Sequence, residues 1–223
     1  MQNNTTAAIN NLRRLGHQRR EAREETQRIE QALGAAFAAR GFAVVANWMP
    51  DRALHGTAGE VDLIVALEGV VLVIEVKSTF LRKSQKEVFH HASGTLRRAG
   101  NQVRKKVSAV VRELKGEGPL RQALGCADEA LAPQVIGWIV DTSIECDHQH
   151  FSGVLKVSLE EVLIALRDDA ALLWDPDHLF AAGVPGPTGN HAAAPDEDSL
   201  YPLGFSARRL VEVITREEVW RDL

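Results

Sequence analysis

The sequence predicts an α/β fold in which a mixed β-sheet carries helices on both faces. Two strongly apolar runs within residues 59–77 indicate core strands. Amphipathic stretches at 18–40 and 95–115 indicate helices on either side of those strands, and residues 134–141 (QVIGWIVD) indicate a further buried strand. Helices and strands that alternate along the chain favour α/β over segregated α+β architecture.

Residues 59–77 (GEVDLIVALEGVVLVIEVK) predict a β-hairpin. Val, Ile and Leu fill most of both runs, and Glu68-Gly69 separates them. A two-residue turn there would set Asp62 opposite Glu75, while a three-residue turn or a bulge would shift the pairing. Burial should exclude both acids from such a hairpin unless something compensates their charge.

Two more charged residues lie at the same end of the hairpin. In the two-residue-turn register Glu60 faces Lys77, and because side chains alternate along a strand, three carboxylates and one ammonium share one face. A hard divalent cation would supply the missing compensation, and Mg²⁺ usually takes one or two carboxylates from a protein. The alternative is a solvated strand end with a surface ion pair.

Each helix beside the hairpin has one apolar stripe. The first consists of Ile29, Leu33, Ala36 and Phe37, followed by Gly41 as a C-terminal stop, and the second of Val103, Val107, Val110, Val111 and Leu114. Glu30 borders the first stripe, where it faces either the sheet or solvent. Gln102 and Lys106 form an i, i+4 pair beside the second stripe, so both can face one neighbour.

Local composition assigns the rest of the chain. We expect polar loops at 49–58, 78–94 and 142–151, a connector at 116–133, and strands at 42–48 and 153–157. Ser158 and Glu161 form a capping box that begins a helix running to Trp174. Residues 183–204 are rich in Pro and Gly, and for residues 206–223 helix and strand both remain open.

Length and composition suit one main domain. The chain has 223 residues, 45% hydrophobic and 25% charged, and we divide it into a polar arm (1–20), a domain (21–175) and an acidic Pro/Gly-rich linker with a C-terminal element (176–223). No apolar run approaches the roughly 20 residues that span a bilayer. The N-terminal residues lack an apolar signal stretch, and two cysteines are too few for a disulfide framework. We therefore expect a cytoplasmic protein without a membrane partner.

Charge is unevenly distributed within a net charge of −4. From Arg82 to Lys115, ten Lys or Arg stand against two Glu, a local charge of +8. A basic block directly after an acidic site is expected where phosphates approach a metal, and a solvated helix face is an equal alternative. The candidate nucleic-acid contacts are Arg82, Lys83, Lys86, Arg97, Arg98, Arg104, Lys105 and Lys106.

The hairpin resembles the signature of the PD-(D/E)XK phosphodiesterase superfamily, the restriction-endonuclease-like nucleases. The matching residues are Asp62, twelve intervening residues, then Glu75-Val76-Lys77. GEVDLI followed by VIEVK is similar to NERD-type and small bacterial nuclease-like families with a GEIDLI…FVEVK signature. Those families carry a Glu on the first helix, which Glu30 fits, and a Gln on the helix after the hairpin, which Gln102 fits. The resemblance covers about residues 22–165.

The resemblance implies a restriction-endonuclease-like core and hydrolysis of phosphodiester bonds with Mg²⁺ or Mn²⁺, on DNA by family precedent. It implies that Lys77 orders the attacking water and steadies the phosphate charge, and that Gln102 positions the substrate or Lys77. Glu60 is shared with the subgroup without a settled role. A homodimer stays open, since nucleases that cut two strands often pair. The implied metal ligands are Asp62, Glu75, the backbone carbonyl of Val76 and, directly or through water, Glu30.

Two other functions remain open from the sequence. A non-catalytic nucleic-acid-binding or interaction module on the same fold would use the basic segment for phosphate contacts. The retained acids and lysine of the hairpin argue against it, because binding alone needs no buried carboxylates. The second is a zinc site built from Cys146, His148 and His150, with or without Cys126. The spacing of these residues argues against it, because it matches no closed tetrahedral zinc pattern.

Overall fold

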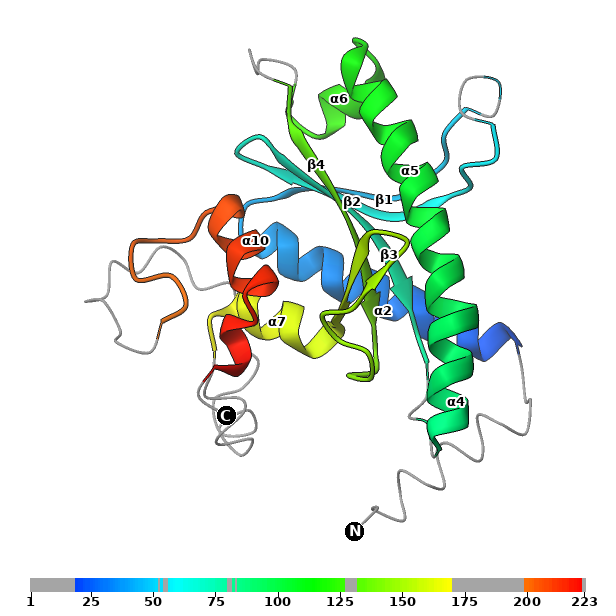
Figure 1. Ribbon diagram of the computed structural model, residues 1–223. Coiled ribbons are helices and arrows are strands. Elements are labelled where there is room, and N and C mark those ends of the chain that lie inside the picture. Colours follow the sequence, from blue (N-terminus) through cyan, green and yellow to red (C-terminus); the bar gives the residue numbers. More distant parts are fainter. Residues whose placement is uncertain are drawn as a thin grey trace.

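The computed structural model describes residues 19–51, 53, 56–79, 82, 84–126, 132–169 and 199–221. The predictions for residues 1–18, for Lys83 and for residues 170–198 lie outside this part of the chain. A six-stranded sheet with the strand order β1-β2-β3-β4-β6-β5 runs through the centre (Figure 1). Its strands are Ala43–Trp48 (β1), Val61–Leu67 (β2), Val70–Lys77 (β3), Gln134–Asp141 (β4), His150–Phe151 (β5) and Val154–Ser158 (β6).

The sheet is mixed. Strands β1, β2 and β3 pair antiparallel, β4 pairs parallel with β3 and with β6, and β5 returns antiparallel to β6. The helical segment between β3 and β4 is the long crossover that parallel strands require. The mixed α/β sheet predicted from the sequence is therefore confirmed.

Helices cover both faces of the sheet, as predicted. α2, α7 and α10 share a hydrophobic core with one face, and α5 and α6 share one with the other (Figure 1). Within the described ranges, none of the helices combines the length and the apolar character that a membrane crossing needs. The helices are Arg19–Ala39 (α2), Gln85–His90 (α4), Arg97–Lys115 (α5), Pro119–Ala123 (α6), Leu159–Arg167 (α7) and Ala207–Thr215 (α10), with a π-helical turn His91–Leu96 (η1) and a 3₁₀ turn Glu218–Trp220 (η2).

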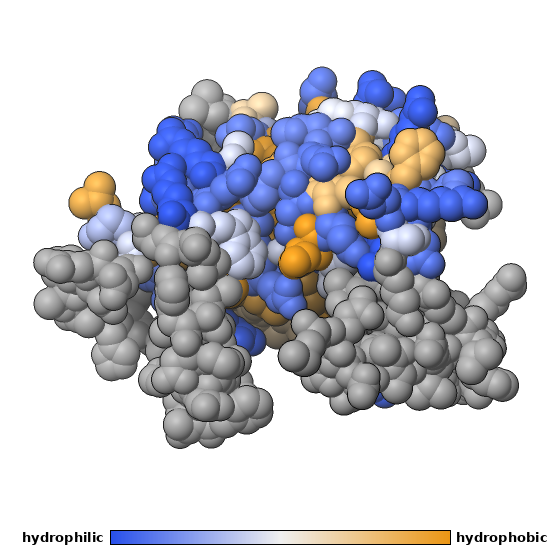
Figure 2. Space-filling model, turned by 60° about the horizontal axis from the view of Figure 1, so that its bottom comes forward, coloured by the Kyte–Doolittle hydropathy of each residue, from blue (hydrophilic) through white to orange (hydrophobic). Residues whose placement is uncertain are grey.

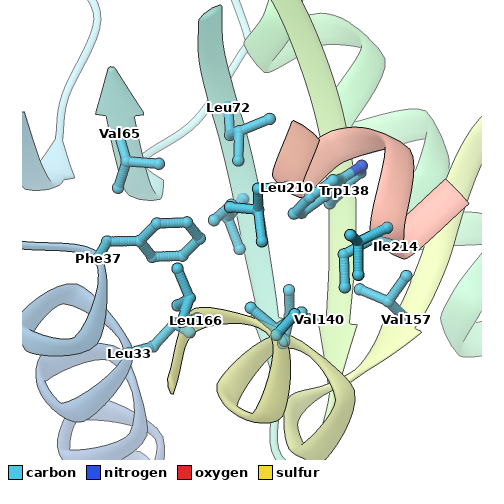
Figure 3. Close-up of a cluster of buried hydrophobic side chains, with 14 of the residues drawn as sticks. Leu33, Phe37, Val65, Leu72, Trp138, Val140, Val157, Leu166, Leu210 and Ile214 are labelled. Atoms are coloured by element: carbon cyan, nitrogen blue, oxygen red, sulfur yellow. The ribbon is translucent and has the colours of Figure 1, made fainter. Parts of the chain in front are cut away.

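Strand alternation decides which side chains meet which helices. Figure 3 shows Leu33 and Phe37 of α2, together with Leu210 of α10, around strand residues such as Leu72. The even-numbered positions of β3 belong to this core, whereas its neighbours at 71 and 73 pack against α5 and α6. The same alternation puts the side chains at positions 75 and 77 on the α5 side of the sheet.

The prediction of a polar loop at 78–94 is wrong for the second half of that range. Residues Gln85–His90 form α4, and the π-helical turn leads from it directly into α5. Ser84 caps α4, because its hydroxyl accepts a hydrogen bond from the Glu87 N–H at 3.3 Å. α4 buries none of its residues, so it lacks the apolar stripe from which the longer helices are predicted.

The C-terminal elements also differ from prediction. α7 begins at the predicted cap, where Ser158 accepts from the Glu161 N–H at 3.3 Å, but it ends at Arg167, earlier than expected. It stops because Asp168 adopts the left-handed conformation at φ 58°. The segment after Ser206 is a helix, α10, and it packs with α7 in the larger core. The two-residue strand β5 and the five-residue helix α6 have no counterpart in the sequence prediction, since they are too short for a periodic pattern.

We predict that Gly100→Ala destabilises the protein. A Cβ at this position of α5 would overlap the backbone carbonyl of Phe151 in β5. Because two backbones meet there, neither can move aside easily, and we expect the free energy of unfolding to fall by about 1–3 kcal/mol in urea titrations followed by circular dichroism. Gly94→Ala is the matched control, since a Cβ there meets nothing within 4 Å. Unchanged stability of the Gly100 variant would contradict this close approach.

Candidate active site

The hairpin has the two-residue turn predicted from the sequence. Glu68 and Gly69 both have positive φ values, 49° and 75°, as the type I′ turn of a tight hairpin requires. The pairing runs from Leu67 opposite Val70 to Leu63 opposite Ile74, in the predicted register. The backbone ladder ends there, one pair before the two acids.

A side chain continues the pairing where the ladder ends. Asp62 Oδ2 accepts a hydrogen bond from the Val76 N–H at 2.8 Å. Its other oxygen, Oδ1, accepts from Lys106 Nζ at 3.0 Å. The same ammonium donates to Glu75 Oε2, while Glu75 Oε1 accepts from Lys77 Nζ at 2.5 Å. Two carboxylates from the hairpin and two ammonium groups thus form one connected cluster, which we call the carboxylate–lysine cluster (Asp62, Glu75, Lys77 and Lys106).

Burial sets the electrostatics of this cluster. Burial and the neighbouring Glu75 raise the pKa of Asp62, against the opposing effects of Lys106 and the Val76 N–H. Burial lowers the pKa of Lys106, but the two carboxylates outweigh that effect and the pKa is raised. Lys106 therefore keeps its charge although its residue is only 4% exposed. At Asp62 burial is the largest cause of the shift, whereas at Lys106 the two neighbouring carboxylates are decisive.

Glu30 faces this site from α2. The residue is buried at 9% exposure, so the helix-border acid points inward and not to solvent. Burial first, and then the charges of Asp62, Glu60 and Glu75, raise its pKa to about 7. Glu60 itself is exposed and precedes β2, so the predicted pairing of Glu60 opposite Lys77 is not part of the ladder.

The donor set of the cluster suits a hard cation. Oxygens of Asp62 and Glu75 converge on a single positive group, the Lys106 ammonium, at the end of the hairpin. Carboxylate oxygens are the ligands that Mg²⁺ prefers, and it usually keeps several of its waters. In the part of the chain that the structure describes, no set of three or more His, Cys, Asp or Glu side chains is arranged to hold a metal ion. The residues therefore fit a cation that takes two carboxylates and completes its shell with water.

α5 contributes a different residue from the one predicted. Gln102, the expected substrate-positioning residue, is exposed one turn before Lys106. Lys106, predicted from the sequence as a phosphate contact, is instead buried between the two carboxylates. The only sequence signal for Lys106 at the site was its i, i+4 spacing from Gln102 beside the apolar stripe. That spacing did not show which of the two side chains would reach the carboxylates.

A second polar network, absent from the sequence prediction, adjoins the cluster. Asp141 ends β4, is paired in register with Lys77 and is fully buried. His91 Nε2 lies 2.9 Å from Asp141 Oδ2, and Thr79 and Ser143 also hydrogen-bond to this carboxylate. Burial raises the pKa of Asp141, but the hydrogen bonds from His91 and Thr79 outweigh it and the pKa is lowered. The π-helical turn that begins at His91 aims its ring at the strand end. Only the place of a polar residue at the end of a buried strand could have indicated Asp141.

The basic segment divides into buried and exposed members. Arg82 is one of the buried ones: its side chain is 4% exposed and bonds to Glu145 and Ser143, so it is not on a phosphate-binding surface. Lys83 lies outside the described residues. The remaining predicted contacts are exposed: Lys86, Arg97, Arg98, Arg104 and Lys105.

A surface groove of about 670 Å³ runs beside α5 on the side of the hairpin. One wall is the segment Thr57–Ala58, which leads into β2 and Asp62. The other wall is a strip of α5 with Asn101, Arg104, Lys105, Ser108 and Arg112. Seen from the lower end of Figure 1, the described surface of the protein is mostly hydrophilic with small hydrophobic areas (Figure 2).

The residues of the zinc alternative do not gather. Cys126 packs in the core between the sheet and α6, and Cys146 packs beside a separate apolar cluster on α5. His148 Nε2 instead lies 2.9 Å from Glu161 Oε2, a fully buried carboxyl whose pKa burial raises to about 7. His148 thus forms a hydrogen-bonded pair that joins the loop before β5 to α7.

No family model, curated protein or solved structure matches the chain in comparisons of sequence and fold. The resemblance of the hairpin to PD-(D/E)XK nucleases therefore stays an expectation from its motif.

We predict that Glu30→Gln flattens the pH dependence of stability measured in EDTA. Glu30 keeps its proton up to a pKa of about 7 in the folded protein, against 4.5 in the unfolded chain. Between these values the folded state binds more protons, so wild-type stability falls as pH rises, by about 3 kcal/mol for this group at pH 8. Glu161 contributes with the same sign in both proteins, so the difference between wild type and variant isolates Glu30.

The measurement is urea unfolding from pH 5 to pH 8. Glu24→Gln, an exposed exchange on the same helix, is the matched control and should keep the wild-type slope. Identical slopes for wild type and Glu30→Gln would show that Glu30 does not face the acidic site.

Proposed function

We propose that this protein is a Mg²⁺-dependent nuclease that hydrolyses phosphodiester bonds of nucleic acid, with DNA as its substrate. The observation that carries the proposal is the carboxylate–lysine cluster: a buried acid (Glu75), a partly buried acid (Asp62) and two lysines meet at the end of a core hairpin. Buried carboxylates are costly, and structural needs alone would be met more cheaply by apolar residues. Strongly perturbed ionisable groups that gather at one site are typical of catalytic centres.

Each residue of the site has a defined task in this proposal. Asp62 and Glu75 hold the divalent cation, and Glu30 adds negative charge from α2. Mg²⁺, when bound, polarises the phosphoryl oxygen and lowers the pKa of a coordinated water. Lys77 has a side chain that is 26% exposed, so its ammonium can reach a phosphate at the mouth of the site while it stays near Glu75. It holds positive charge where the phosphate gains negative charge during the reaction.

The groove beside α5 supports a polyanionic substrate. Its wall carries Arg104, Lys105 and Arg112, and its other side leads along the chain to Asp62. Lys and Arg on one helix face are the electrostatic footprint of a protein that contacts a phosphate backbone. A nucleic-acid strand in this groove would lie along the segment that leads into β2, whose second residue is Asp62.

A second candidate is a nucleic-acid-binding module without catalysis. One observation favours it: a lysine ammonium, rather than a third carboxylate, completes the pair Asp62 and Glu75. In that case the groove would bind nucleic acid in EDTA as well as in Mg²⁺, and no product would form. The two functions therefore separate in one assay that scores binding and cleavage together.

We predict that wild-type protein cleaves DNA in Mg²⁺ or Mn²⁺ but not in EDTA, and that Lys77→Ala and Asp62→Asn abolish this cleavage. Supercoiled, linear and single-stranded DNA are incubated with each protein and analysed on gels, which also distinguishes internal cuts from end digestion. The loss follows because each variant removes a charge that the reaction needs while the fold remains.

Lys115→Ala, at the exposed end of α5, is the control and should cleave like wild type. Circular dichroism verifies that every variant is folded. Wild-type rates in a clean preparation of either site variant would refute the assignment, and DNA that is bound but never cut by wild type would favour the second candidate.

We further predict that the double variant Arg104→Ala/Lys105→Ala weakens DNA binding and its salt dependence. Each lost phosphate contact reduces the slope of log K against log salt by about 0.9 for duplex DNA, so the slope should fall by about 2. Fluorescence anisotropy in EDTA at several salt concentrations measures it without cleavage. Arg208→Ala, exposed on α10 across the sheet, should leave the slope unchanged. An unchanged slope in the double variant would exclude this groove.

A further inference from the structure

Lys106 occupies the point at which the two acids of the site converge. Its ammonium donates to Asp62 Oδ1 at 3.0 Å and to Glu75 Oε2, although the side chain comes from a different element, the middle of α5. The side chain is 5% exposed, so water hardly shares in this neutralisation. Lys106 is thus the main counter-ion of this carboxylate pair, in which Glu75 is buried and Asp62 partly buried.

Every oxygen of this pair already has a partner. Asp62 Oδ2 takes the Val76 N–H, and Glu75 Oε1 takes the ammonium of Lys77. The remaining two oxygens are those that Lys106 holds. These two oxygens are the ones that converge on one point, so a divalent cation that bridges both carboxylates competes for them and repels an ammonium group at contact distance.

We propose that Lys106 is an exchangeable counter-ion, which neutralises Asp62 and Glu75 in the metal-free protein and leaves them when a divalent cation binds. This inference rests on the proposed function, since it assumes that the pair takes a metal. Lys106 is a positioning residue in this scheme, because it keeps the two acids together and ionised before the metal arrives. Removal of only one partner of a buried ion pair is costly, so the cation must take over the charge that the ammonium gives up.

The position of Lys106 on α5 allows its ammonium to move from the carboxylates to solvent. It lies at the border of the buried face, one turn after exposed Gln102 and next to exposed Lys105. A lysine stem is flexible and carries its charge at the tip, so rotation about its side-chain bonds moves the ammonium to water while the stem stays against the protein. The backbone of α5 need not move.

The first experiment uses wild-type protein. Lysines are acetylated with a limiting amount of an activated acetate ester, in EDTA and in saturating Mg²⁺, and the modified positions are quantified by mass spectrometry. Lys106 should be protected in EDTA and react several-fold faster in Mg²⁺, whereas Lys105 should react equally in both. Continued protection of Lys106 in saturating Mg²⁺ would overturn the exchange.

The second experiment measures Mg²⁺ affinity by calorimetry. Lys106→Met removes the competing charge and should bind Mg²⁺ roughly tenfold more tightly than wild type, with a larger rise in melting temperature on Mg²⁺ addition. Lys106→Arg keeps the charge and should keep the weaker affinity, and Lys105→Met is the control for loss of a surface charge. Equal affinity of Lys106→Met and wild type would contradict the exchange.

Asp62→Asn separates this inference from the proposed function. If wild type and Asp62→Asn take up Mg²⁺ equally, the metal does not bind at this pair and the proposed function fails with the inference. If Asp62→Asn loses Mg²⁺ binding while Lys106 stays protected in the wild-type labelling experiment, only the exchange fails. The labelling result decides the matter even if Lys106→Met does not fold.

Discussion

The carboxylate pair of buried Glu75 and partly buried Asp62 is the constraint on which the rest of the structure depends. Two carboxylates at the end of a core hairpin need a cation, and the nearest comes from α5. The helix must therefore lie close over the sheet, and glycines permit that approach: a Cβ at Gly137 would meet Val103, and one at Gly100 would meet β5. The ion pairs of Lys106 and the close packing at Gly100 and Gly137 thus favour the same position of α5 over the sheet.

Polar contacts on the α5 face and apolar packing on the opposite face both fix the end of the sheet that carries the carboxylate–lysine cluster. Beside the carboxylate–lysine cluster, Asp141 ties the end of β4 to His91 in the π-helical turn, and Lys156 of β6 is fully buried against Asp147. On the opposite face α2, α7 and α10 form a continuous apolar core. The carboxylate–lysine cluster and the Asp141 network therefore meet at one end of the sheet on the α5 side, where the charged groups of each network share partners, while apolar packing holds the sheet that carries them.

Local periodicity explains how much of this was predictable. Alternation within the hairpin and helical stripes in α2 and α5 gave the correct element types, and the two-residue turn gave the register that brings Asp62 near Glu75. α4 was missed because a helix that buries nothing has no stripe. α7 ended early because Asp168 takes a left-handed conformation, which no periodic pattern reveals.

By itself, the sequence determined the α/β class, because helical and strand patterns alternate along the chain. It also determined the hairpin and the place of Asp62, Glu75 and Lys77 at its end, because these follow from the spacing of neighbours along one strand pair. Only the tertiary structure decided which charges are buried. Lys105 and Lys106 are adjacent and chemically identical, yet one is exposed and the other lies between two carboxylates. That difference depends on the rotation of α5 over the sheet, which is set by packing between segments far apart in the chain.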